Sequence, residues 1–423
     1  MDTPKSSKNQ RFTVDGREPE EVNIPESVEQ LAGTLHRADE QRRAVVPTGL
    51  GAFLHLGAPP RKYDVALSLQ QLNHVVDYQP TDMTVTVEAG MPLAQLQQEL
   101  GAHGQWLPID PPLPERATIG GIVAANLSGP ARLAHGTIRD ALLGLKAVRA
   151  DGTVIKGGGK VVKNVAGYDI PKLFCGSFGT LGVIVEATFK VLPRPEAQAT
   201  LAFACPTVDA AMNAVLHITG SELQPAFLEI ANFAPLASFN GPYPYRLFVG
   251  FAGIAEEVQY QRERLCTLVG ADGAVEMACG EEQAQSLVQT LRDFPAQGSA
   301  TLRCKASLLP TKVALFCRDA EAEAQSRGLS VQLLAHAGNG IVYSRFTQLD
   351  ELPPDKLISF IDWLRILTKK LAGYLVVEDL AATLKERVDV WGHVGGAFPL
   401  MKRLKDTLDP NGTLNPGRFV GGI

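Results

Sequence analysis

Long apolar runs and paired cysteines are both missing from this sequence. No run of about 18 apolar residues occurs, so we expect no membrane-spanning helix. None of the six cysteines forms a C-x-x-C pair, and their spacing fits no common iron–sulfur pattern. We therefore expect free, mostly buried thiols and no cluster bound by this chain. The cysteines are Cys175, Cys205, Cys266, Cys279, Cys304 and Cys317.

Basic stretches and a secretory signal are missing as well. The net charge is -5, and no basic run interleaved with aromatic residues occurs, so nucleic acid is not an expected partner. The first residues are polar and contain no apolar segment of the kind that signal peptides carry. With free thiols, this predicts a cytoplasmic protein, and any contact with a membrane is expected to be peripheral or through a partner.

Glycine, in contrast, is abundant. The chain has 423 residues, 45% hydrophobic and 20% charged, with 40 glycines, which describes a soluble globular protein of two or more domains. One glycine turn, residues 176–182, leads directly into a stretch from Val183 to Val191 that alternates apolar and polar residues. The alternation predicts a half-buried strand, and the turn before it can bring bare backbone N–H groups against a ligand. The alternative is a tight connection between core strands.

Two further glycine turns occur in the first half. A short apolar strand at 44–46 leads into Pro47–Ala52, but Leu54 stands where a dinucleotide fingerprint needs its third glycine, and the ending of a P-loop is also missing. Thr118 can cap a small-residue helix whose first turn holds Gly120 and Gly121. The unpaired N–H groups of such a turn favour an anion, and small residues admit either a pyrophosphate or a neighbouring helix.

The periodicity predicts an α+β fold. Ser27 and Gln30 indicate a helix start, and Asp151–Gly152 indicates a hairpin. After residue 195 the pattern reads β-α-β-β-α twice, which suggests paired ferredoxin-like units with helices on one face and an inserted helix at 281–294. Strands are expected at 199–204, 226–230, 246–252, 300–306, 329–336, 341–346 and 374–378, and helices at 207–219, 256–269, 311–326 and 354–371.

The glycine loops, taken in order, resemble the FAD-binding domain of the vanillyl-alcohol-oxidase/PCMH flavoprotein superfamily. The resemblance is carried by residues 46–51, 107–112, 118–121, 136–140, 160–169, 179–184 and 415–418. It implies a two-part FAD-binding domain followed by a ferredoxin-like cap. The implied ranges are a polar N-terminal extension at 1–24, the FAD domain at 25–195, the cap at 196–400, and a segment at 401–423 that returns toward the FAD domain.

The resemblance also implies roles for single residues. The pyrophosphate would lie against Pro47, Thr48, Gly49, Leu50, Gly51 and Ala52, with its second phosphate against Thr118, Gly120 and Gly121. The ribityl chain and ring would contact Asp110, Pro111, Gly136, Arg139 and Asp140. The adenosine and ring edge would contact Gly179, Thr180, Gly182, Val183 and Ile184. Ala52 stands where covalent members carry histidine, so the FAD is expected to be non-covalent.

Departures from the family concern the second domain. Related 2-hydroxy-acid dehydrogenases carry H-x-G-D-G-N-x-H, whose two histidines help to hold a divalent metal. Here His336 is kept, but Asn339 and Tyr343 replace the acidic residue and the second histidine. A lone histidine is more often a hydrogen-bonded core residue, so no metal is expected. No catalytic residue is assigned. Lys163, Tyr168 and Arg139 could approach a substrate carboxylate or could serve as packing and surface residues.

The resemblance implies an FAD-binding subunit of a 2-hydroxy-acid oxidase complex. It would oxidise glycolate to glyoxylate and pass electrons to a partner iron–sulfur subunit, beside a homologous catalytic FAD subunit. One alternative is a non-catalytic FAD-carrying or structural subunit paired with that flavoprotein, which the altered histidine motif favours. Another is a stand-alone oxidase of D-lactate or a sugar acid.

Overall fold

The computed structural model describes residues 10–159, 168–269, 274–297, 302–349 and 352–423, which form two compact units. The first unit contains residues up to 128, residues 137–194 and residues 385–423. The second contains residues 129–136 and 195–384. In the part described, no helix combines the length and the hydropathy that crossing a membrane would require.

The first unit opens with a small parallel sheet. Its strands are β1 (Glu21–Asn23), β2 (Val45–Thr48) and β3 (Val65–Ser68), in the order β1-β3-β2. Helix α1 (Val28–Glu40) packs Leu31 and Leu35 into the core and is capped by Ser27, whose hydroxyl accepts from the Gln30 N–H. The predicted helix start is therefore confirmed.

A five-stranded antiparallel sheet forms the rest of this unit. Its order is β4-β5-β9-β7-β8, and the predicted strand from Val183 is its central member. The predicted hairpin around Gly152 joins β7 to β8. The strands are β4 (Val75–Gln79), β5 (Thr84–Glu88), β7 (Leu142–Val148), β8 (Val154–Gly158) and β9 (Val183–Lys190), and β6 (Gln105–Trp106) pairs separately with β10 (Leu192–Pro193). The helices are α2 (Leu93–Gly101), α3 (Ile119–Ala125), α5 (Ile138–Ala141) and α6 (Ile170–Phe174).

The C-terminal segment completes the first unit. After α12 (Ala382–Lys385), helix α13 (Phe398–Leu408) leads into residues that run beside β2. Val45 donates its N–H to the Thr413 carbonyl and accepts from the Asn415 N–H, at 2.7 and 2.9 Å. Leu414 between them is fully buried in the core of this unit.

The second unit is one antiparallel sheet of eight strands in the order β14-β11-β13-β12-β16-β17-β15-β18. Each half has the ferredoxin-like strand order, and the pairing of β12 with β16 joins the halves. The paired units expected from the sequence are therefore present. The strands are β11 (Ala197–Cys205), β12 (Phe227–Ala231), β13 (Tyr245–Gly253), β14 (Val275–Met277), β15 (Leu302–Ser307), β16 (Ser330–His336), β17 (Ile341–Thr347) and β18 (Tyr374–Asp379).

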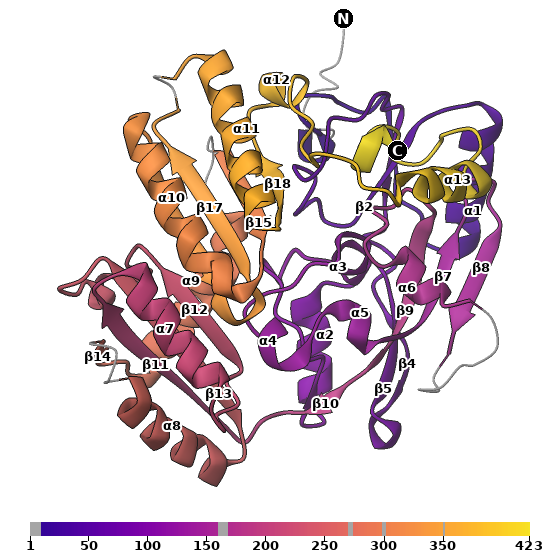
Figure 1. The fold of residues 1–423 in the computed structure, drawn as a ribbon. Coiled ribbons are helices and arrows are strands. Elements are labelled where there is room, and N and C mark those ends of the chain that lie inside the picture. The colour runs from indigo at the N-terminus through magenta and orange to yellow at the C-terminus, as the bar shows by residue number, and fades with distance from the viewer. Residues whose placement is uncertain (1–9, 160–167, 270–273, 298–301, 350–351) are drawn as a thin grey trace, which may run out of the picture. The chain divides into compact units, whose positions relative to one another are not determined.

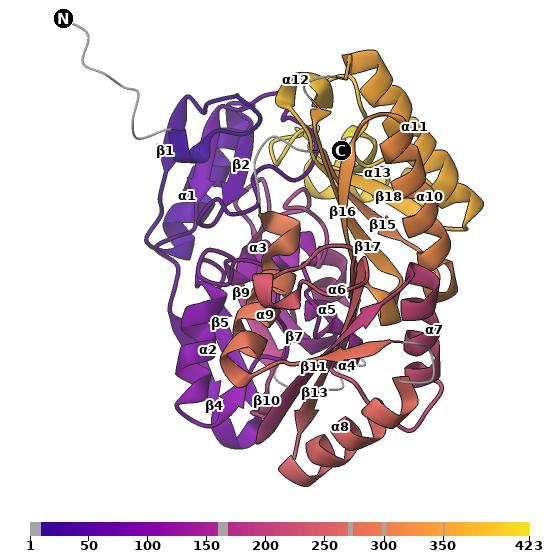
Figure 2. The same cartoon turned by 90° about the vertical axis from the view of Figure 1, so that its left-hand side faces the viewer.

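Helices lie on both faces of this sheet. The four repeat helices pack on one face, as Figure 1 shows, and they are α7 (Val208–Thr219), α8 (Ala255–Val269), α10 (Val313–Ser326) and α11 (Pro354–Lys370). The inserted helix α9 (Glu281–Asp293) lies on the other face (Figure 2), where Leu287 and Leu291 pack with Phe248 and Tyr343. A short helix α4 (Arg132–His135) packs on β12.

The domain boundaries differ from those expected. Residues 129–136 belong to the second unit because α4 packs on its sheet. The chain rejoins the first unit at residue 385, where the buried Lys385 ammonium lies 2.8 Å from Asp15. Phe12 and Val14 are buried and the Phe12 carbonyl accepts from Tyr63, so the described part of the expected N-terminal extension is packed into the first unit. These are tertiary contacts, which local sequence patterns do not report.

Candidate functional site

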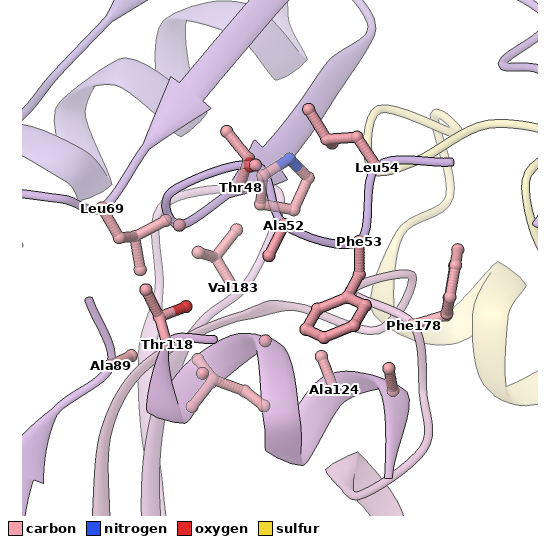
Figure 3. A pocket seen from close by; sticks show the side chains of 18 of the residues that line it. Thr48, Ala52, Phe53, Leu54, Leu69, Ala89, Thr118, Ala124, Phe178 and Val183 are labelled. Atoms are coloured by element: carbon pink, nitrogen blue, oxygen red, sulfur yellow. The ribbon is translucent and has the colours of Figure 1, made fainter. Parts of the chain in front are cut away.

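A cavity in the first unit is lined by three backbone turns (Figure 3). It encloses about 800 Å³, solvent-open space at its mouth included, which is the size of ordinary cofactor sites. Most residues that the sequence assigned to the cofactor line it. They are Pro47, Thr48, Gly49, Leu50, Gly51, Ala52, Thr118, Gly120, Gly121, Gly179, Gly182, Val183 and Ile184.

The first turn follows β2, and hydrogen bonds from the end of β3 hold its backbone in place. Leu69 donates its N–H to the Thr48 carbonyl, and the Ser68 hydroxyl donates to the Gly49 carbonyl. Only glycine fits at position 49, because a Cβ there would lie 2.2 Å from Thr118 Oγ1. The close approach joins the first turn to the second, so the backbones of both border one cavity.

The second turn departs from the expected helix start. Thr118 occupies the N-cap position of α3, but its side chain makes no capping hydrogen bond. The N–H groups of Ile119 and Gly120 donate to the carbonyls of Met91 and Ala89, at 2.9 and 2.7 Å. These two donors are therefore not available to a phosphate. Gly120 serves instead for close packing on Ala89, whereas a Cβ at Gly121 would meet only Thr118.

The third turn, before β9, is fixed by the C-terminal segment. Gly179 has a φ of +67°, and a Cβ there would lie 3.0 Å from Asn415 Nδ2. The Thr180 hydroxyl donates to the Ser177 carbonyl, and the Thr180 carbonyl accepts from the buried Lys405 ammonium at 2.9 Å. Thr180 thus shapes the turn and does not line the cavity, whereas Val183 reaches into it (Figure 3).

The sequence reasoning missed several lining residues. Phe53 and Phe178 bring aromatic rings to the cavity, and Figure 3 shows the Phe53 ring above α3 near Ala124. Asn415 and Arg418 come from the C-terminal segment, whose family-like motif was visible in the sequence but gave no link to this cavity. The missed residues are Phe53, Leu54, Leu69, Ala89, Arg116, Ala124, Ala125, Phe178, Asn415 and Arg418.

Asn415 presents a buried acceptor at the cavity. Its Nδ2 donates to the Phe178 carbonyl at 2.7 Å, which fixes the orientation of the amide. Its Oδ1 is buried and has no hydrogen-bond partner among the described residues. Because buried polar atoms are almost always hydrogen-bonded, this oxygen suits a donor on a bound ligand.

Other expected cofactor residues lie elsewhere. Asp110 and Pro111 follow β6 and are not among the residues that line the cavity, and Gly136 belongs to the second unit. Asp140 accepts from the N–H and hydroxyl of Thr137 and so caps α5, which lowers the pKa of its carboxyl. Arg139 on the same helix does not line the cavity either. The cofactor roles of these residues stay predictions.

The candidate substrate residues are also dispersed. Tyr168 is 98% exposed, which fits a surface residue, and Lys163 lies outside the described residues with most of the 160–169 motif. His336, in contrast, is buried in the second unit, with Nδ1 2.6 Å from Glu229. No group of three or more metal-ligating side chains with the geometry of a metal site occurs in the part of the chain that is described.

FAD fits the cavity in the first unit. The turns at 47–52 and 179–184 present backbone to it, and the free Asn415 oxygen can accept from a ring or ribose donor. Ala52 lines the cavity with a methyl group that cannot bond covalently to a flavin. The expectation of a non-covalent FAD stays a prediction.

Comparisons with known proteins agree with FAD as the cofactor. A model described as an FAD binding domain matches residues 19–158, and one described as the C-terminal domain of FAD linked oxidases matches residues 194–419, more than half of the chain. Glycolate oxidase subunit GlcD of Bacillus subtilis is 28% identical, over 95% of this chain and 89% of that protein. A probable mitochondrial D-lactate dehydrogenase of Danio rerio is also 28% identical, over 96% and 85%.

Two further comparisons cover part of the sequence or only the fold. Glycolate oxidase subunit GlcE of Escherichia coli is 38% identical over 172 residues, which are 40% of this chain and 49% of that protein. An alkyldihydroxyacetonephosphate synthase structure matches with a TM-score of 0.71 at 20% identity, over 94% of this chain and 77% of that one. The latter shows the fold alone, the expected two-part FAD-binding fold with an α+β cap. The chain therefore belongs to the FAD-linked oxidases and is an FAD-dependent oxidoreductase.

Proposed function

We propose that this chain is the FAD-binding subunit of a 2-hydroxy-acid oxidase complex that oxidises glycolate to glyoxylate. The observation that carries the proposal is the cavity formed where the Gly49 turn meets Thr118 and the Gly179 turn meets Asn415. The choice of substrate is supported by similarity to two glycolate oxidase subunits, one along nearly the whole chain and one over 40% of it.

Bound FAD supplies an acceptor for the two electrons that leave the substrate. The residues of this chain have three tasks around it. The turns at 47–52 and 179–184 bind it through backbone, Asn415 orients it through its free Oδ1, and Phe53 and Phe178 exclude water. The remaining cofactor assignments made from the sequence, including Asp110, Gly136 and Arg139, belong to the proposal as well.

An exit for the electrons through a partner completes the proposal. All six cysteines are free, and burial raises the pKa of the thiols of Cys175, Cys304 and Cys317, which keeps them protonated. Iron–sulfur clusters are held by groups of cysteines at characteristic spacings, which these six cysteines do not have. We assign the cluster to a partner iron–sulfur subunit, beside a homologous catalytic flavoprotein, and place the complex in the cytoplasm or peripherally at the inner membrane.

A second candidate is a subunit that carries FAD without turning over. It is favoured by Tyr343 and Asn339, which replace the histidine and the acidic residue of the related dehydrogenases. A stand-alone oxidase of D-lactate is the third candidate, and it is supported by the similarity to D-lactate dehydrogenases along most of the chain.

One spectroscopic experiment separates these functions. The chain is purified alone, its flavin absorbance is recorded, and glycolate or D-lactate is added without oxygen. Bleaching by glycolate supports turnover by this chain, and bleaching by D-lactate alone supports the third candidate. A flavin that bleaches only after the partner subunits are added identifies a carrier subunit. A flavin that no 2-hydroxy acid reduces, with or without partners, contradicts the proposal.

A further inference from the structure

The cavity in the first unit carries charge of one sign. Among the described residues that line it, two are charged, Arg116 and Arg418, and none is acidic. FAD brings two negative charges to such a cavity on its pyrophosphate, and burying a charge costs free energy unless an opposite charge pairs with it. Backbone N–H groups contribute dipoles without net charge, so the pyrophosphate needs a cation as well as the glycine turns.

Arg418 is committed to contacts within the chain. Its guanidinium donates to the carbonyls of Leu54 and Leu56, in the loop after the first turn, and lies 5.4 Å from the centre of the Phe178 ring. Its charge is also offset by Asp15, with which it interacts electrostatically. Arg418 therefore serves to hold the loop, and the other arginine is left for a ligand.

Arg116 has a fixed backbone and a free side chain. The N–H groups of Arg116 and Ala117 both donate to the Leu113 carbonyl, and the Ala117 carbonyl accepts from the Leu93 N–H. Ala117 is buried in the core, whereas Arg116 and Thr118 on either side of it line the cavity. No described residue forms a hydrogen bond or an ion pair with the Arg116 guanidinium. The exposed side chain is therefore available to a ligand in the cavity.

Arg116 also stands beside the junction of the first and second turns. Thr118, two residues further along the chain, approaches Gly49 so closely that no Cβ fits at position 49. The resemblance implied that the start of α3 takes the second phosphate, but the N–H groups of Ile119 and Gly120 donate to carbonyls of the chain. An anion at this junction therefore lacks donors that were expected from α3, and the Arg116 guanidinium can supply them.

We propose that Arg116 pairs with the pyrophosphate of FAD and makes this cavity select flavins that carry a pyrophosphate. The planar guanidinium presents several N–H donors to phosphate oxygens together with a full positive charge. Arg116 is a binding residue and takes no part in the oxidation itself. The inference goes beyond the proposed function, because it concerns the cofactor and holds for any 2-hydroxy acid that is oxidised.

The test compares FAD with riboflavin, which has the same ring system but no phosphate. The purified apoprotein is titrated with each flavin, and flavin fluorescence gives the affinity. We expect Arg116→Met to bind FAD at least tenfold more weakly than the wild type and to bind riboflavin equally well, because only FAD brings a negative charge to the arginine. Arg116→Lys, which keeps the positive charge, should weaken FAD binding by about threefold at most.

Salt and ADP give two further readouts. Dissolved ions screen an exposed charge pair, so the difference in FAD affinity between the wild type and Arg116→Met should shrink between about 50 mM and about 500 mM sodium chloride. ADP carries the pyrophosphate without the flavin ring, so its inhibition constant against FAD should rise at least tenfold in the variant at low salt. This measurement replaces the riboflavin titration if riboflavin binds too weakly to be followed.

Controls separate binding from folding and from the proposed function. Arg403→Met removes an exposed arginine from α13, in the same unit, and should change none of these affinities. Melting temperature identifies variants that fail to fold, and Arg116→Gln repeats the test if Arg116→Met is one of them. Equal FAD affinity of the wild type and the uncharged variant at low salt, or a loss that riboflavin shares and salt does not change, would overturn the inference. The proposed function would stand in either event if glycolate still bleaches the FAD-loaded chain.

Discussion

The guanidinium of Arg418 lies 2.7 Å from the carbonyl oxygen of Leu54, 364 residues earlier in the chain. The same nitrogen also donates to the carbonyl of Leu56 at 2.6 Å, and Trp391 donates to the Arg418 carbonyl. Burial lowers the pKa of Arg418 to about 10, so it stays charged at neutral pH. The last turn of the chain thus holds the loop that follows the first cofactor turn.

Replacing Arg418 should therefore release this loop. Arg418→Gln removes a buried charge-assisted pair of hydrogen bonds, each worth about 1.5–3 kcal/mol. We expect FAD to bind at least tenfold more weakly, as measured by titrating the apoprotein and following flavin fluorescence. Arg403→Gln, an exposed arginine on α13, is the matched control and should leave the affinity unchanged. Equal affinity for FAD in the two variants would show that the Arg418 hydrogen bonds to the loop do not contribute to FAD binding.

Gly49→Ala should block the junction between the first and second turns. The new Cβ would lie within 2.9 Å of three Thr118 atoms, so one turn must move. We expect the purified variant to lose most of its bound flavin, read as the absorbance ratio at 450 and 280 nm. Gly395→Ala, where a Cβ meets nothing within 4 Å, should retain it. Adding Thr118→Ala to Gly49→Ala should restore part of the flavin, because two of the three clashing atoms disappear.

Asn415→Gly tests the role of Asn415 Oδ1, the buried acceptor that has no hydrogen-bond partner among the described residues. Residue 415 has a φ of +46°, which glycine tolerates, so the change removes the side chain without backbone strain. We expect FAD affinity to fall about tenfold, equivalent to about 1.4 kcal/mol. Asn411→Gly also loses a side-chain hydrogen bond on this segment, to Asp39, and should not change the affinity. A similar loss in both variants would indicate a general effect on stability.

Asp140 should stabilise the fold in a pH-dependent manner. Hydrogen bonds from Thr137 hold the pKa of Asp140 below its ordinary value of 3.8, so its stabilisation is present above that value and is lost as the pH falls through the lowered pKa. Asp140→Ala should lower the free energy of unfolding by about 1 kcal/mol at pH 7, as for other helix caps, and by much less near pH 3. Urea unfolding at both pH values measures the difference. A pH-independent difference would exclude the charged cap.

The glycine turns of the site were predictable, because glycines that leave the backbone uncovered by side chains can be recognised in the local sequence. Gly49 and Gly179 stand in turns beside readable strands. Arg418 and Phe178 were missed because their roles arise from contacts across hundreds of residues. Thr118 was only partly predictable. Its predicted position before α3 is correct. The first N–H groups of that helix, however, donate to the carbonyls of Met91 and Ala89, which belong to an earlier segment of the chain.

In the second unit, too, features with a local sequence pattern were predictable and contacts between distant residues were not. Its repeated β-α-β-β-α order followed from periodicity, since each helix and strand carries its own pattern. The buried contact between Glu229 and His336 did not, because the two residues are 107 residues apart and meet only through the pairing of β12 with β16. Residues 129–136 likewise join this unit through packing that no local pattern reveals.

The first unit consists of separate stretches of the chain, so it cannot be completed before the last of them has been synthesised. Val45 in the parallel sheet finds its partners Thr413 and Asn415 only after the second unit has been synthesised. During translation the cavity therefore lacks Asn415 and Arg418 until the second unit has been synthesised. A chain that stops before residue 415 would lack both the Asn415 oxygen at the cavity and the Arg418 hydrogen bonds that hold the loop after the first turn.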